Sequence, residues 1–245
     1  MNICIIGASS GIGLALSRRL AGEGHRVWGI ARRKEALQSL ERSLPAGSFQ
    51  WSAGDISEVE DMASATETMR SKGFLADAVI IAAAIFNDDL KDGRHDFAAG
   101  KRVFEVNVFG VMHCIEMFLD DFLAKKNGHF VILSSIAAFR PGSRGIAYPA
   151  TKAAVSLVSR GFGLAMRGTG VLFSTVYLGP VSSPMWEGKA GFPVITPEQA
   201  AEKISKILVS RRSTYYIPFF STMIARMSRV LSDRMYARLR NILFK

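Results

Sequence analysis

Tyr148 and Lys152, in the middle of the sequence, have the residue types and spacing for proton transfer. Residues four apart share one face of a helix, so the two side chains can meet. A tyrosine that acts as a general acid must release its proton near neutral pH, although its ordinary pKa is about 10. One ammonium about 4 Å away supplies roughly 4 kcal/mol, enough to lower that pKa toward neutrality. The pair predicts acid–base catalysis, although an exposed helix pair has the same spacing.

Ser135 strengthens the catalytic interpretation because of its place along the chain. It directly follows the apolar run 129–134, which predicts a strand. In open parallel sheets, ligands lie at the carboxyl ends of the strands. We therefore expect Ser135 at the same edge as Tyr148.

The opening residues "GASSGIG" predict a phosphate-binding turn. Gly7 follows the strand predicted at 2–6, and Gly11 and Gly13 open the helix predicted at 11–21. Gly7 would allow the turn, Gly11 would let a phosphate approach the backbone, and Gly13 would pack helix on strand. The helix N-terminus adds free N–H groups and a partial positive charge. A tight turn without a ligand is the alternative, but the strand–turn–helix context favours a dinucleotide.

The end of the second predicted strand favours NADP(H) over NAD. NAD-binding folds usually place an acid there for the ribose 2′-hydroxyl. Here Ala31 occupies that place, and Arg32 and Arg33 follow, which suit a 2′-phosphate. The alternative is a surface pair of arginines at a helix start. Asp55 and Ile56, after the third strand, could frame the adenine, or Asp55 could cap the next helix.

Apolar runs and amphipathic runs alternate along the whole chain. Strands are predicted at 2–6, 25–31, 48–51, 77–84, 129–134, 171–177 and 214–217, and helices at 11–21, 33–43, 58–71, 100–125, 148–167 and 197–209. Continuous apolar strands that alternate with helices are typical of a parallel sheet covered on both faces. We therefore predict an α/β fold with a Rossmann-like, doubly wound parallel sheet. It forms a single domain, residues 1–218, with a C-terminal helical extension, residues 219–245.

Composition narrows the setting in which the protein works. No run of 18 uncharged apolar residues occurs, and no signal peptide precedes the first apolar run. Cys4 and Cys114 suggest no disulfide framework, so a cytoplasmic location is expected. Eight of the Lys and Arg residues that give the net charge of +10 lie between Arg211 and Lys245, with one acid. The basic character therefore belongs mostly to a tail, and no nucleic-acid motif accompanies it.

The motifs together identify the chain as a member of the short-chain dehydrogenase/reductase family, which it resembles over nearly its whole length. "GASSGIG" is similar to the family's glycine motif, and "YPATK" to its Tyr-x-x-x-Lys motif. Ser135, thirteen residues before Tyr148, falls on the catalytic serine, and "VNVFG" supplies the catalytic asparagine, Asn107.

The resemblance implies an oxidoreductase that interconverts a carbonyl and an alcohol. Tyr148 would be the general acid or base, Ser135 would hold the substrate oxygen, and Asn107 would bind a water of the proton relay. Lys152 would bind the nicotinamide ribose and lower the pKa of Tyr148. No metal is implied. The implied cofactor-binding residues are Gly7, Ser9, Ser10, Gly11, Ile12, Gly13, Arg32, Arg33, Asp55, Ile56, Ala83, Tyr148, Lys152, Gly179, Val181 and Ser183.

Two segments depart from the family pattern. The family's Asn-Asn-Ala-Gly aligns with residues 81–84, where Ala82 and Ala84 replace polar and glycine positions. In "LGPVSSP", Leu178 replaces a proline, and Ser183 stands for a threonine that reaches the carboxamide. These changes bear on cofactor affinity and keep one alternative function open, a cofactor-binding regulator without turnover.

The segment 182–197 predicts a loop over the substrate. Its apolar residues, Met185, Trp186 and Phe192, indicate a medium-sized apolar ketone, aldehyde or secondary alcohol, unless they only anchor the loop. Phe86 and Phe139 could add to the pocket wall. Arg140 and Arg144 leave an acidic substrate open.

Two helical surfaces predict contacts beyond the core. The run 100–125 is apolar nearly all round, which favours burial against a partner subunit as well as the sheet. The resemblance implies a homodimer or homotetramer built on this helix and the one that starts at Tyr148.

The tail forms a basic amphipathic stripe with apolar residues at three- and four-residue steps from Phe220 to Ile242. Packing on the domain or a neighbouring subunit is the favoured interpretation, in which truncation after Pro218 lowers stability and binding to anionic vesicles is weak. A membrane-surface contact is the alternative.

Overall fold

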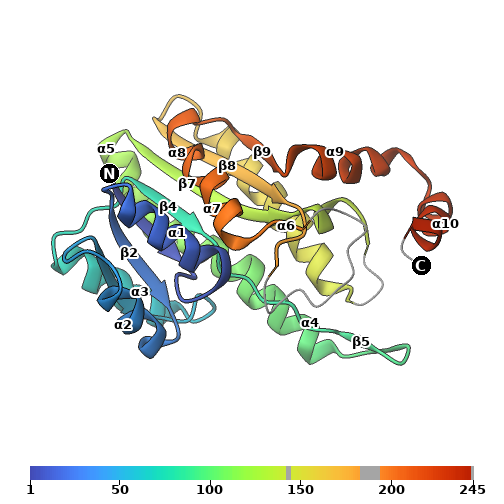
Figure 1. The fold of residues 1–245 in the computed structure, drawn as a ribbon, viewed down its shortest axis with the longest axis horizontal. Coiled ribbons are helices and arrows are strands. Elements are labelled where there is room, and N and C mark those ends of the chain that lie inside the picture. Colours follow the sequence, from blue (N-terminus) through green and yellow to red (C-terminus); the bar gives the residue numbers. More distant parts are fainter. Residues whose placement is uncertain (142–144, 183–193, 244–245) are drawn as a thin grey trace.

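The computed structural model of the chain describes residues 1–141, 145–182 and 194–243. Its centre is a seven-stranded parallel sheet in the order β3-β2-β1-β4-β7-β8-β9 (Figure 1). The strands are β1 (Asn2–Ile6), β2 (Arg26–Ala31), β3 (Phe49–Ala53), β4 (Ala78–Ile81), β7 (Gly128–Ser135), β8 (Val171–Leu178) and β9 (Thr214–Ile217). This sheet confirms the predicted α/β fold.

Both faces of the sheet are covered because its strands are apolar on both sides. In β1, Ile3 and Ile5 pack into one core cluster, and Cys4 and Ile6 pack into the other. One face is covered by α1 (Gly11–Gly22), α2 (Lys34–Arg42), α7 (Pro197–Ser205) and α8 (Ile207–Ser210). The opposite face is covered by α3 (Val59–Ser71), α5 (Gly110–Lys125) and α6 (Ala147–Ala165).

The predicted helix 100–125 is wrong as a single regular element. The structure has α4 (Phe97–Phe104), then a π-helical turn over Glu105–Phe109, then α5. A π-turn holds one more residue per turn than the α-helices beside it. The turn carries Asn107, one of the expected site residues.

A small antiparallel hairpin before α4 was not predicted. Strand β5 (Leu90–Lys91) pairs with β6 (Arg94–His95) across Asp92 and Gly93. Both turn residues have positive φ, 49° and 74°, as a type I′ turn requires. The Asp-Gly pair is a turn signal, but strands of two residues leave no periodic pattern around it.

The chain after β9 leaves the sheet and runs along the molecule to its far end. It consists of α9 (Phe219–Met227), a short 3₁₀ turn over Ser228–Val230 and α10 (Asp233–Leu243) (Figure 1). Extended backbone at Leu231 separates the two helices, so the predicted stripe is not one continuous helix. Among the helices of the described segments, none is long and apolar enough to span a bilayer.

Candidate active site

The predicted site residues come together at the carboxyl edge of the parallel sheet. Gly7 follows β1, Ala82 follows β4, and Ser135 ends β7, and these three strands are neighbours in the order β1-β4-β7. Because the strands are parallel, all three ends lie at one edge. Tyr148 and Lys152 reach the same edge from the first turns of α6.

The glycine turn is shaped for a group that approaches the backbone closely. Gly7 has a φ of +94°, and a Cβ there would lie 2.7 Å from the Ala83 nitrogen. A Cβ on Gly13 would lie 2.2 Å from the Gly7 oxygen, so α1 packs directly on the turn. Gly11 has a φ of +51° and open space where a Cβ would stand.

The first turn of α1 also suits a phosphate. Ser10 occupies the N-cap position, but no side-chain hydrogen bond caps the helix. The first N–H groups of a helix lack partners within it and attract anions. Because these N–H groups are free, the turn fits the pyrophosphate of a dinucleotide. The neighbouring residues in the sequence are Ser9, Ser10 and Ile12.

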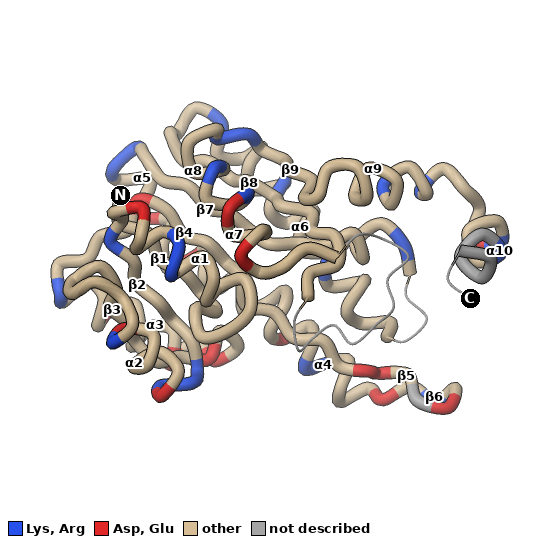
Figure 2. Tube along the Cα trace, in the orientation of Figure 1, with Lys and Arg blue, Asp and Glu red and all other residues tan. Residues whose placement is uncertain are grey.

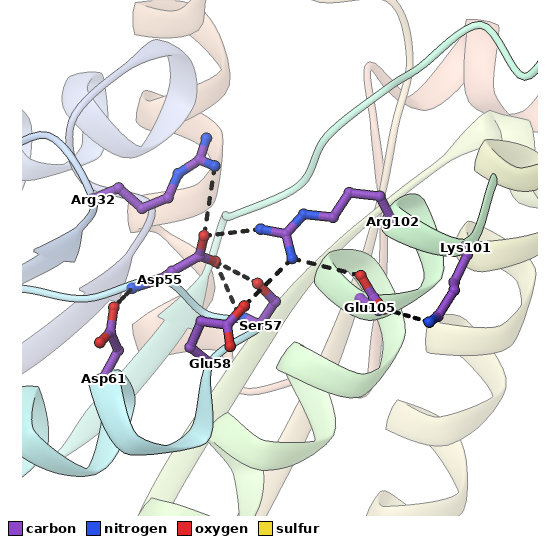
Figure 3. Close-up of polar contacts among 8 residues, drawn as sticks. All are labelled: Arg32, Asp55, Ser57, Glu58, Asp61, Lys101, Arg102 and Glu105. Atoms are coloured by element: carbon purple, nitrogen blue, oxygen red, sulfur yellow. Dashed lines mark hydrogen bonds and ion pairs between the residues drawn. The ribbon is translucent and has the colours of Figure 1, made fainter. Parts of the chain in front are cut away.

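The two arginines after β2 have different neighbours. Arg33 reaches back to the glycine turn, where its Nη2 lies 3.2 Å from both the Ser9 hydroxyl and the Ser9 carbonyl oxygen. Arg32 is 61% exposed at its side chain and lies 3.6 Å from an Asp55 oxygen (Figure 3). Arg33 is therefore tied directly to the glycine turn, whereas Arg32 faces Asp55.

Asp55 is the centre of a polar cluster that the sequence did not reveal in full (Figure 3). Its carboxylate accepts hydrogen bonds from the Ser57 hydroxyl at 2.7 Å and from Arg102 at 3.0 Å. Burial raises the pKa of Asp55, but the bonds from Ser57 and the charges of Arg102 and Arg32 outweigh it and hold that pKa below its ordinary value. Glu58, not Asp55, is the N-cap of α3, so the alternative in which Asp55 caps this helix is wrong.

Ile56, which could frame the adenine of a bound dinucleotide, is a buried residue. Its side chain is 6% exposed and belongs to the core cluster beneath α5. A Cβ on Gly110 would lie 2.6 Å from the Ile56 carbonyl oxygen, so the backbone is also enclosed. Ile56 therefore acts as a core residue that fixes the position of the Asp55 loop.

Tyr148, Ser135 and Lys152 form the reactive cluster. Burial raises the pKa of Tyr148 to about 12, and its hydrogen bond with Ser135 acts in the opposite direction. The Lys152 Nζ lies 5.7 Å from the centre of the Tyr148 ring and donates a hydrogen bond of 3.0 Å to the Leu133 carbonyl. Burial lowers the pKa of Lys152 to about 8.

These values correct the expectation that the pKa of Tyr148 is lowered. The phenolate loses its hydration in the buried site, and this effect exceeds the favourable effects of its neighbours. Tyr148 therefore keeps its proton at neutral pH in the ligand-free chain.

Asn107 is buried in the π-turn and bonded on both sides of its amide. Its Oδ1 accepts from the Ile85 nitrogen at 2.8 Å, and its Nδ2 donates to the Ile85 oxygen at 2.9 Å. The same Nδ2 lies 3.2 Å from the Thr151 hydroxyl, one residue before Lys152. Asn107 therefore joins the chain after β4 to the helix that carries Tyr148 and Lys152.

Asp89 is a site-forming residue that the sequence analysis missed. Its carboxylate is fully buried and accepts hydrogen bonds from the backbone nitrogens of Ile146 and Ala147 at 2.7 and 3.0 Å. These N–H groups begin α6, directly before Tyr148. The sequence signal was an acidic pair before an Asp-Gly turn, which gave no indication that α6 lies beside it.

The segment after β8 lies at the same edge of the sheet. The Gly179 nitrogen donates to the Ile217 oxygen at 2.7 Å, and Val181 forms a parallel bridge with Ile195. The two ends of the predicted substrate loop are therefore paired. Ser183, Met185, Trp186, Phe192 and Arg144 lie outside the described residues.

An aromatic residue, Phe86, packs against Tyr148. The Phe86 and Tyr148 rings meet edge to face with centroids 5.4 Å apart, and Phe86 is 39% exposed. Phe139, four residues after Ser135 in the chain, stacks on Tyr177 with ring centroids 4.8 Å apart. Arg140, which the sequence left open as a substrate contact, instead bonds the tail through the Ser228 and Leu231 carbonyls.

Comparison with known proteins shows which family and fold the chain shares. The model of the short chain dehydrogenase family matches residues 1–191. An uncharacterised oxidoreductase of Listeria innocua is 30% identical over 190 residues, which are 76% of each chain. A fatty acyl-CoA reductase of Acinetobacter baylyi is 27% identical over 215 residues, 84% of this chain and 72% of that protein. A crystal structure of an actinorhodin polyketide ketoreductase variant with NADPH has a TM-score of 0.80 at 22% identity and covers 88% of this chain and 94% of that one.

Proposed function

The chain belongs to the short-chain dehydrogenase family of oxidoreductases, and from this premise we propose that it reduces an apolar ketone or aldehyde with NADPH. The observation that carries the proposal is the meeting of Tyr148, Ser135 and Lys152 beside the uncapped N-terminus of α1. The three side chains can move a proton to or from a substrate, and the N-terminus of α1 can hold the phosphates of a dinucleotide.

Tyr148 gives its proton to the substrate oxygen, and Ser135 donates a hydrogen bond to the same oxygen. The nicotinamide, when bound, supplies the hydride that the carbonyl carbon accepts. The alkoxide that forms is a stronger base than the phenolate, so a phenol with a pKa of about 12 is still a competent acid. The raised pKa favours reduction, because oxidation would require Tyr148 to begin without its proton.

Lys152 returns the proton that Tyr148 has lost. With a pKa lowered to about 8, its ammonium is mostly protonated at neutral pH but releases a proton readily. Its expected hydrogen bonds to the cofactor ribose place it beside Tyr148 during reduction. Asn107 holds the first turns of α6 in register through Ile85 and Thr151, and its Oδ1 keeps a second lone pair for a water of the relay.

The two arginines after β2 support NADP(H) as the cofactor. No acid stands at the end of β2, and Arg33 lies against Ser9 of the glycine turn. The ketoreductase that shares this fold was crystallised with NADPH. The remaining cofactor contacts are expected from Gly7, Gly11, Gly13, Asp55, Ala83, Gly179, Val181 and Ser183.

Cofactor choice is tested by fluorescence titration with NADPH and NADH. We expect NADPH to bind more tightly, and Arg32→Ala and Arg33→Ala to weaken it roughly tenfold to a hundredfold each, since each removes a charge-assisted hydrogen bond. Arg32→Ala should leave NADH binding unchanged, and Arg42→Ala, an exposed arginine at the end of α2, is the matched control. Equal binding of both cofactors by the unmutated chain would contradict the assignment.

The aromatic residue beside Tyr148 supports a medium-sized apolar substrate. Phe86 contributes apolar surface beside Tyr148, and Phe139 stacks on Tyr177 four residues after Ser135 in the chain. One relative is named a fatty acyl-CoA reductase. A panel of aromatic and long-chain ketones and aldehydes, followed through NADPH absorbance, tests this class. Tight NADPH binding without turnover on any of them would favour the alternative, a cofactor-binding regulator.

The same chain is expected to form a homodimer or homotetramer. Helices α5 and α6 expose Met112, Leu157 and Leu164 to the extent of 40%, 69% and 62%. A shallow groove between the two helices is lined by Phe109, Met112, His113, Glu116, Leu119, Asp120 and Phe162. This face fits a second copy of the chain.

A further inference from the structure

Helix α9 turns its small polar residues inward and its large apolar residues outward. Ser221 and Thr222 are buried against the domain, and the Thr222 hydroxyl bonds the Pro218 carbonyl at 2.6 Å. Phe220, Ile224 and Met227 are 82%, 59% and 66% exposed. These three residues therefore do not pack on the chain's own body, and packing on a neighbouring subunit, the other part of that expectation, stays a prediction.

The exposed stripe continues beyond α9 and is bordered by arginines. Val230 and Met235 are 88% and 56% exposed. The exposed basic residues of this segment are Arg226, Arg229, Arg234 and Arg238. From residue 219 to the end, the sequence has one acid, Asp233, which pairs with Arg140 at 2.8 Å. The tail thus carries exposed apolar residues and arginines along the same segment. Figure 2 marks the basic positions along its trace.

The inner side of the tail is fixed to the turn that follows Ser135. Arg140 is 11% exposed at its side chain, bonds the Leu231 carbonyl at 2.5 Å and lies 4.9 Å from the centre of the Tyr236 ring. Arg226 lies over the Tyr216 ring, which stacks on Tyr177 beside the active site. The tail is therefore held in place on its inner side, while Phe220, Ile224 and Met227 stay largely exposed within the described part of the chain.

We propose that this outer face binds an anionic lipid surface. Phosphate headgroups neutralise the arginines, and the apolar side chains insert between them, as in helices that lie in the plane of a membrane interface. A second copy of the tail is a poorer partner, because a twofold contact would bring two sets of arginines together with no free acid on either side. Given the proposed function, the site beside the tail would receive apolar substrate from the lipid.

The test is flotation of the full chain with phosphatidylcholine vesicles, with and without about one third phosphatidylglycerol. We expect binding to the anionic vesicles at least tenfold tighter than to the neutral ones, and a further loss when salt rises from about 0.05 to 0.5 M. Phe220→Ser/Ile224→Ser and Arg229→Gln/Arg238→Gln should each lower binding about tenfold or more.

Matched controls make the result specific to the tail. Leu75→Ser/Val209→Ser changes two exposed apolar residues, and Arg18→Gln/Arg42→Gln two exposed arginines, on other surfaces. Both should bind vesicles as the unmutated chain does, and circular dichroism checks that every variant is folded.

Two results would overturn the proposal. One is the absence of binding to anionic vesicles at low salt, or binding that the tail variants leave unchanged. The other is a fall in molecular mass by light scattering when Phe220→Ser/Ile224→Ser is introduced, which would assign the face to a second copy. Flotation needs no substrate, so either result leaves the proposed reduction intact, and failure of the reduction leaves the flotation result intact.

Discussion

Removing the hydroxyl of Tyr148 separates its role in proton transfer from the binding of NADPH. Tyr148→Phe keeps the ring that packs on Phe86 but removes the proton. We expect the rate of carbonyl reduction to fall roughly 10²–10⁴-fold, as for loss of a general acid, with NADPH affinity unchanged. Single-turnover NADPH oxidation measures the first quantity and fluorescence titration the second.

The matching substitutions are Lys152→Ala, which should damage both quantities, and Tyr215→Phe, which removes a hydroxyl bonded to Ser210 and should damage neither. If Tyr148→Phe kept more than about a tenth of the rate, the acid would have to be another group.

The buried ammonium of Lys152 makes stability depend on pH. Its folded pKa, about 8, lies below the ordinary 10.5, so between these values the unfolded chain binds more protons and stability rises with pH. Lys152→Met removes this dependence. Its stability relative to the unmutated chain should therefore fall by about 2 kcal/mol between pH 7 and 9.5.

Urea unfolding of the ligand-free chain at both pH values measures this difference. Lys203→Met, an exposed lysine on α7, is the control and should show none. A constant difference between Lys152→Met and the unmutated chain would mean that Lys152 is charged equally easily in both states.

At this scale the sequence predicted residues whose role depends on local spacing. Gly7, Ser135 and Tyr148 lie at the predicted carboxyl edge of the sheet. Their positions could be predicted because local sequence patterns indicate where strands end and helices begin. The Arg33–Ser9 contact, the Arg102–Asp55 pair and the Arg140 contacts with the tail join residues that are far apart in sequence. No local pattern records such contacts, so they required the structure.

Among the elements, α6 depends on a cap from outside its own sequence. Asp89 accepts the two N–H groups that open the helix. In Asp89→Asn, an amide nitrogen would face one of them, which leaves a buried donor without an acceptor. We expect a loss of about 1–3 kcal/mol in stability.

The same change should lower kcat more than it raises KM, because a displaced α6 moves Tyr148 relative to Ser135. Steady-state kinetics and urea unfolding measure the two effects. Asp88→Asn is the control, since that neighbouring side chain is exposed. Equal effects of both variants would exclude a specific role for Asp89 in positioning.

The strands and most helices could be predicted because burial on two faces leaves long apolar runs. Both β1 and β9 have the predicted bounds, 2–6 and 214–217. The hairpin β5–β6 and the break in the helix 100–125 could not be predicted. The first is too short for a period, and in the second the apolar residues continue through the break.

For the whole molecule, the exposed face of α5 and α6 predicts assembly. Leu157 and Leu164 lie two turns apart on one side of α6 and are 69% and 62% exposed. Leu157→Arg/Leu164→Arg would place two charges in that face, and a multimer should then become a monomer. Light scattering coupled to size exclusion measures the mass.

Val209→Arg changes a residue that is 85% exposed on α8 and should leave the mass unchanged. An unmutated chain that is already monomeric at micromolar concentration would contradict this assignment of the face. The predicted division at residue 218 stays a prediction, which limited proteolysis can address.

The π-turn at Glu105–Phe109 has a consequence for exchanging parts between relatives. It inserts one residue, so α4 and α5 run out of helical phase by about 100°. Deleting a single residue would restore a regular helix and rotate everything that follows, including the outer face of α5, by that angle. A chimera that takes α4 from one protein and α5 from another must therefore keep the turn as one unit, or its subunit face and its Asn107 will point in incompatible directions.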